Sequence, residues 1–346
     1  MTSPPAAPSP ANTIYLDDMG ELIASIPSMI GFPPENSLVL ITFHIDERIQ
    51  LGATMRMDLP EEGHAPDLVG QLCLTAVANN ADVAVPVIVG GSADPPELPY
   101  RWLMDFVAQE LDDVDIPIVH AIWVPAIEFG ETWWCYVDEE CTGQVRDPQC
   151  SALAALHTYA GLVRYASRAE MAAHLAPDRE DRVAHVAQLL AEQSGKPAGA
   201  AAVEQWAQVS AAIDATADTV PDLPDEQIAR LAAALSDPLV RDNCLPLPLT
   251  DRGDAAELLW TALIRVVPAP ERASPAILLA IHAYLRGEGV LANLAVEVAL
   301  DADPDHDLAR LVRDALDRGL PPTVLRSMIE ESVSSAERIL AAEADR

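Results

Sequence analysis

The sequence predicts an α/β domain, in which helices cover a mixed sheet, followed by an all-α domain. Two observations lead to this fold class. Residues 18–159 alternate apolar runs of strand length with helical apolar patterns, as in a sheet covered by helices. From Asp178 onward the apolar patterns have helical spacing and none has strand spacing. The 346 residues are enough for each half to bury its own core.

The strands expected in the first half are apolar or alternating runs bounded by turn residues. Asp46-Glu47 separates the first two, which predicts a hairpin, and the last is expected as a hairpin or edge strand. Pro86 and Pro117 lie inside two of the runs. Because proline has no N–H to donate, they favour edge positions or the first residue of a strand. The expected strands are 37–44, 49–59, 82–89, 116–124 and 131–137, with a short strand also considered at 162–165.

Helices are expected between these strands and throughout the second half. Ser167 and Glu170 form a capping box, which predicts a helix running to about Leu175. The other helices expected in the first half are 18–30, 66–79, 100–111 and 149–159. In the second half they are 178–194, 200–217, 225–235, 254–266, 274–287, 290–302, 305–318 and 322–342.

These patterns divide the chain into a disordered tail at 1–12, an α/β domain at 13–177 and an all-α domain at 178–346. The tail is rich in Pro, Ala and Ser and lacks the basic start and apolar stretch of a secretory signal. No apolar run reaches the roughly 18 residues that a membrane span needs. The five cysteines are an odd number at uneven spacings, which suits reduced thiols. We therefore expect a cytoplasmic protein with no membrane partner.

The charge of the chain excludes one class of partner. The net charge is −33, and residues 1–150 hold 24 acidic residues but only four arginines. So few cations cannot displace the counterions of a nucleic-acid backbone, and we expect no nucleic-acid partner. A surface of this sign suits a basic protein, a cation or simple solubility.

The helical half contains one pattern typical of interaction proteins. Small residues at regular spacing let two antiparallel helices pack closely, and Asp303-Pro304 ends the second helix. One such tetratricopeptide-like unit cannot stack into a groove, so we expect a helical hairpin rather than a peptide-binding surface. The pattern consists of Tyr284, Gly287, Ala292, Ala295, Ala299, Asp303 and Pro304.

Several segments resemble an actinobacterial family known only as domain of unknown function 4192. The resemblance is carried by LIASIPSMIGFPPENSLVLITF near the start and by the run from Glu257 to Pro322. Arg56-Met-Asp58, Trp133-Trp134 and SRAEMAAHLAP (167–177) follow the family's order. The family's Cys-rich segment after the tryptophans is reduced here to Glu139-Glu140-Cys141. The resemblance covers nearly the whole chain and implies a fold and a cellular setting, but no chemistry.

The cysteines and histidines do not form a recognisable metal motif. Cys135, Cys141, Cys150 and His157 offer four ligand types, but their spacing matches no common zinc knuckle. His120 is expected inside a strand, as a hydrogen-bonded core residue. The chain also lacks a P-loop, H-E-x-x-H and G-x-S-x-G. The sequence therefore predicts no metal, no cofactor and no catalytic residue.

Other residues are candidates for binding a ligand or partner. Arg56 and Asp58 share one face of a strand, and we expect a structural ion pair there in preference to a ligand-binding pair. Glu35, Asn36 and Ser37 enter a strand and either cap that loop or bind a ligand. Trp133 and Trp134 place one ring on each face of an edge strand, so one is expected in the core and the other on a contact surface.

These observations support a non-enzymatic protein-binding or scaffold protein, whose partner is another protein or a second copy. The alternative is an enzyme with a small-molecule site at the strand ends of the α/β domain, near Glu35, Arg56 and Asp58.

Overall fold

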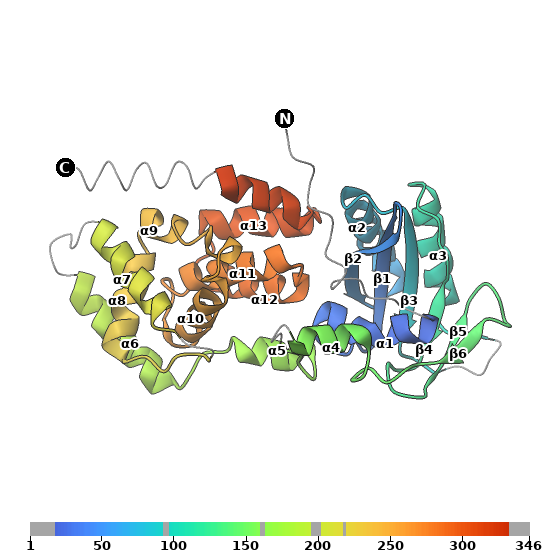
Figure 1. Cartoon of the computed structure of the whole chain (residues 1–346), viewed down its shortest axis with the longest axis horizontal. Helices are drawn as coiled ribbons and strands as arrows, with labels where there is room; N and C mark the ends of the chain where they lie inside the picture. The colour runs from blue at the N-terminus through green and yellow to red at the C-terminus, as the bar shows by residue number, and fades with distance from the viewer. Residues whose placement is uncertain (1–17, 93–96, 160–162, 195–201, 217–218, 332–346) are drawn as a thin grey trace. The chain divides into compact units, whose positions relative to one another are not determined.

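The computed structural model describes residues 18–92, 97–159, 163–194, 202–216 and 219–331 (Figure 1). They form two compact units. The first unit lies within Met1–Cys73 and Asn80–Arg168, and the second within Leu74–Asn79 and Ala169–Arg346. The tail expected at 1–12 lies outside the described residues. The domain boundary at 177/178 stays a prediction.

The first unit is built on a mixed sheet of six strands in the order β2-β1-β3-β4-β5-β6. β3 and β4 are parallel, and the other neighbouring strands are antiparallel. This confirms the predicted mixed sheet. The strands are β1 (Ser37–Ile45), β2 (Ile49–Asp58), β3 (Val83–Val89), β4 (Ile122–Val124), β5 (Thr132–Cys135) and β6 (Thr142–Gln144).

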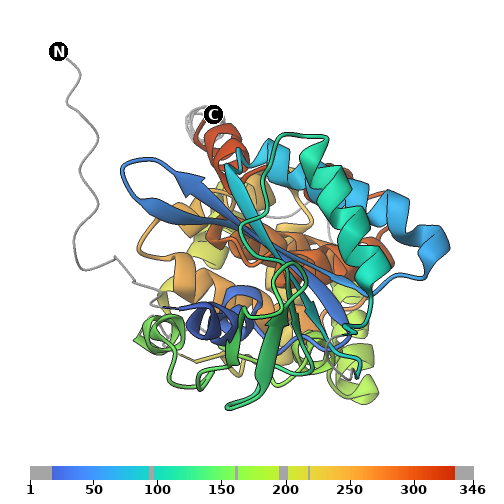
Figure 2. The ribbon, with the colours of Figure 1, turned by 90° about the vertical axis from the view of Figure 1, so that its right-hand side faces the viewer.

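Helices cover both faces of this sheet. Figure 2 shows α2 (Ala65–Ala78) and α3 (Arg101–Asp112) along one face, and α1 (Met19–Ile30) with α4 (Ala152–Tyr159) on the opposite side. α1 contacts the two edge strands, β2 and β6. The first six residues of β1 are all buried, although successive side chains point to opposite faces. A continuous apolar run in this strand is therefore explained by cover on both faces.

The strand expected at 116–124 is mostly irregular. The prediction that Pro86 marks an edge position or the first residue of a strand was wrong, because β3 has a paired strand on each side. Only Ile118 bridges to Ala84 before β4 begins at Ile122. The Ala84 amide donates to the Pro117 carbonyl, and the Ala84 carbonyl accepts from the Val119 amide. Because Pro86 follows two residues later, its backbone faces the same neighbouring segment. Its missing N–H falls where the β3–β4 ladder is interrupted, which lets proline occupy an interior strand.

Two further strand predictions differ from the structure. β6 was not expected, because its three residues are mostly exposed and carry no apolar pattern. Residues 163–165 form no strand, and residue 162 lies outside the described residues.

The second unit is helical over its described residues, which confirms the predicted class. α11 lies at its centre and is buried along nearly its whole length, because α8, α10, α12 and α13 pack against it. The helices are α5 (Arg168–His174), α6 (Glu180–Ser194), α7 (Ala202–Asp214), α8 (Asp225–Leu235), α9 (Pro238–Asp242), α10 (Gly253–Val266), α11 (Ala273–Arg286), α12 (Gly289–Ala302), α13 (Asp307–Asp317) and a last helix at 322–331.

α11 and α12 form the expected helical hairpin. Gly287 ends α11 in the left-handed conformation, with φ of 84°, which glycine adopts without strain. Ala292, Ala295 and Ala299 are fully buried, so the two helices approach closely. The likeness of this hairpin to a tetratricopeptide unit stays a prediction.

No helix among the described residues is long and apolar enough to cross a bilayer.

Candidate functional site

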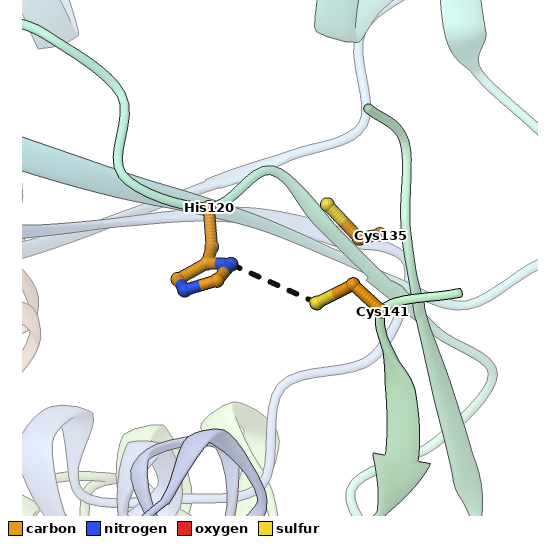
Figure 3. A group of neighbouring side chains, drawn as sticks. All are labelled: His120, Cys135 and Cys141. Atoms are coloured by element: carbon orange, nitrogen blue, oxygen red, sulfur yellow. Dashed lines mark hydrogen bonds between the residues drawn. The ribbon is translucent and has the colours of Figure 1, made fainter. Parts of the chain in front are cut away.

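Three potential metal ligands from separate segments of the first unit lie together. The ligand atoms of His120, Cys135 and Cys141 are all within 4.8 Å of one another. The Cys141 sulfur lies 3.9 Å from His120 Nδ1. Figure 3 shows the His120 ring and the Cys141 sulfur pointing toward each other, with Cys135 beside them.

Pairing among β4, β5 and β6 produces this arrangement. Cys135 is paired with Ile122, two residues after His120, so β5 lies beside the segment that carries the imidazole. The Tyr136 amide donates to the Ala121 carbonyl at 2.8 Å and fixes this register. Across the β5–β6 hairpin the Cys135 amide donates to the Cys141 carbonyl at 3.0 Å. The two thiols therefore occupy opposed positions of one hairpin.

The hairpin turn between the cysteines is held by Asp138. Its carbonyl accepts from the Cys141 amide at 3.1 Å, and its carboxylate accepts from the Glu140 amide at 3.0 Å. Asp138, Glu139 and Glu140 are all exposed. They place three negative charges on the turn that joins the two cysteines, and such charges attract cations.

The surroundings of Cys141 disfavour the thiolate form of its side chain when no cation is bound. Burial raises its pKa above the ordinary value, and the neighbouring Cys135 and Asp138 raise it further. A cation that coordinates this sulfur must displace its proton.

The chemistry of the cluster matches a thiophilic cation. Ligands in a tetrahedral zinc site with two sulfurs and one nitrogen stand about 3.5–3.8 Å apart. The His120–Cys141 separation of 3.9 Å is close to this value, and the largest separation needs only a small side-chain adjustment. Two thiols and an imidazole select zinc-like cations over magnesium or calcium, which take oxygen ligands.

The zinc-ligand set weighed from the sequence is only partly reproduced. Cys135 and Cys141 belong to the cluster, whereas Cys150 and His157 do not. His120 takes their place. It lies half-exposed between the Ile118 bridge and β4, and not inside a strand as expected. The signal that sequence reasoning missed is that a hairpin carrying both cysteines follows directly after β4 and pairs with it.

The candidate residues Glu35, Ser37, Arg56 and Asp58 also lie together, beside the carboxyl end of β3. Arg56 Nε donates to Ser37 Oγ at 2.8 Å, and its terminal nitrogen donates to Asp58 and more weakly to the Glu35 carbonyl. Ser37 Oγ donates to the same carbonyl at 2.7 Å. These bonds join the loop before β1 to β2. A ligand-binding role for the group stays a prediction.

Asn36 joins Glu35, Ser37, Arg56 and Asp58 through its backbone, and we call these five residues the strand-end group. It adopts the left-handed conformation, with φ of 44°, and its carbonyl accepts from the Leu59 amide at 2.9 Å. A Cβ placed on Gly90 would lie 2.8 Å from Asn36 Oδ1. Gly90 also has a φ of 107°, so glycine is required there for both space and conformation.

The paired tryptophans face different surroundings. Trp133 is buried and packs over Gly143, where a Cβ would lie 2.9 Å from the ring. Trp134 is partly exposed and stacks on Trp123, with ring centroids 5.1 Å apart. Trp123 in turn donates to the Gly90 carbonyl at 2.8 Å. A contact surface at Trp134 stays a prediction.

Comparison with known proteins identifies a family. A family model described as "Domain of unknown function (DUF4192)" matches residues 20–323, which include both groups of candidate residues. No curated protein and no solved structure matches the chain.

The strand-end group predicts unequal effects of two substitutions. Only 12% of the Arg56 side chain is exposed, against 83% for Asp58. We expect Arg56→Ala to lower the free energy of unfolding by about 1–3 kcal/mol, because Ser37 loses a buried donor. Asp58→Asn should change it by less than about 0.5 kcal/mol, because exposed ion pairs contribute little. Urea-induced unfolding measures both, and equal losses would contradict this account.

Proposed function

We propose that this chain, which belongs to the domain of unknown function 4192 family, binds a zinc-like cation through His120, Cys135 and Cys141. One observation carries the proposal: the imidazole of His120, which precedes β4, and two cysteine sulfurs of the β5–β6 hairpin converge within 4.8 Å. A thiol–imidazole set of this kind is the usual ligand set of zinc in proteins.

The position of the ligands in the fold supports the same proposal. Two of them lie on a hairpin and the third precedes the strand that pairs with it, so hydrogen-bonded backbone holds the set. Preorganised ligands lose less conformational freedom on binding. The exposed carboxylates at 138–140 raise the local concentration of cations.

Zinc affinity of the full chain tests this function. Metal-free protein, kept reduced, should take up one zinc ion in competition with a chromophoric chelator. His120→Ala, Cys135→Ser and Cys141→Ser should each weaken binding by about a hundredfold or more, because loss of an outer-shell partner alone costs 10–100-fold. Circular dichroism checks that each variant is folded.

Cys150→Ser is the matched control, because Cys150 is an exposed cysteine of the same unit and lies outside the cluster. It should bind zinc as the natural chain does. Equal weakening in this variant, or unchanged binding in Cys135→Ser, would refute the assignment.

A second candidate function is protein binding, and the arginines of the first 150 residues favour it. Arg56 contacts Ser37 and Asp58, Arg146 contacts Asp18, and Arg101 lies over the Tyr136 ring and donates to its carbonyl. The four arginines of this segment can offset at most four of its 24 acidic residues. The remaining negative surface is complementary to a basic protein.

Pull-down from native lysate followed by mass spectrometry distinguishes protein binding from the small-molecule alternative. A stoichiometric basic protein, recovered less as salt rises, would support protein binding, because salt screens exposed charges. A co-purified small molecule without such a protein would instead favour an enzyme site at the strand ends.

A further inference from the structure

We infer that the cation at His120, Cys135 and Cys141 keeps one coordination position for a neutral nitrogen donor from outside the chain, such as an imidazole. This inference rests on the proposed function and names the class of ligand that the same site takes. Three features carry it: the number of ligands, the exposure of the cluster and the surrounding charge.

The ligand count leaves one position of a tetrahedral site unfilled by the chain. Within the part of the chain that the structure describes, no fourth His, Cys, Asp or Glu joins the three ligands. The Asp138 carboxylate, on the turn between the cysteines, accepts from the Glu140 amide instead. Structural zinc sites use four protein ligands, whereas sites that exchange a ligand use three.

The exposure of the cluster lets an outside ligand approach within the first unit. Cys135 is buried, but His120 and Cys141 are both partly exposed. Val119, which precedes His120, and Val137, two residues after Cys135, are 56% and 82% exposed, so the chain on either side of these ligands also lies at the surface. Because two of the three ligands are partly exposed, a donor from solvent can reach the cluster.

The charge around the cluster selects against anions. A divalent cation and two thiolates have no net charge, so the bound cation exerts little attraction on an anion. Asp138, Glu139 and Glu140 add three exposed negative charges, which outnumber the guanidinium of Arg101 over Tyr136. A carboxylate or azide is therefore repelled, while a neutral nitrogen donor is not.

Cobalt(II) provides the test, because its absorption reports both thiolate ligation and coordination. Full-length untagged protein is loaded with Co²⁺ and titrated separately with imidazole and with azide. We expect a thiolate-to-cobalt charge-transfer band, a saturable change of the ligand-field bands with imidazole, and azide binding weaker by about tenfold or more. Cobalt must remain bound after imidazole is removed.

A triple variant tests the role of charge. Asp138→Asn, Glu139→Gln and Glu140→Gln together should strengthen azide binding by about threefold or more and change imidazole binding by less than about twofold, because each exposed charge has a small effect. Asp138→Asn keeps a side-chain oxygen that can accept from the backbone amide of residue 140.

Each contrary outcome has a distinct meaning. Ligand-field bands that respond to neither probe would show that the chain supplies the fourth ligand, which overturns this inference but not the metal site. Azide binding as tight as imidazole would overturn the selection for neutral donors. Absence of the charge-transfer band would overturn the proposed function itself.

Discussion

The register between β4 and the β5–β6 hairpin is the constraint on which the proposed site depends. It pairs Ile122 with Cys135 and Trp134 with Thr142, and it thereby places the two thiols beside His120. A slip of one residue would turn each cysteine to the other face of the sheet. Trp133 over Gly143 and Trp123 against Trp134 pack on either side of this hairpin and oppose such a slip.

Charge connects this local arrangement to the composition of the chain. A net charge of −33 disfavours compactness through self-repulsion, and it favours cations over anions as ligands of the chain. The first 150 residues hold only four arginines against 24 acidic residues, so basic side chains offset little of this charge there. The acidic turn at 138–140 is part of this excess, and the proposed preference for a neutral fourth ligand depends on it.

Local patterns predicted the fold better than the site. The apolar runs of β1 and β3 and the helical periodicity after Asp178 depend on neighbouring residues, so the class of each half was correct. β6 has no apolar residue, and the proline in β3 depends on an interruption in the adjacent ladder, so both needed the tertiary structure. His120 joins Cys135 only through strand pairing, and no local spacing contains that information. In contrast, the Arg56–Asp58 pair was predictable, because both residues lie on one strand face.

X-ray absorption at the zinc edge of the loaded full chain tests the central claim most directly. The account predicts two sulfur neighbours at about 2.3 Å, an imidazole nitrogen at about 2.0 Å and one further oxygen or nitrogen. Cys141→Ser should reduce the sulfur neighbours to one. A zinc shell made only of oxygen and nitrogen, or one unchanged by that substitution, would contradict the site.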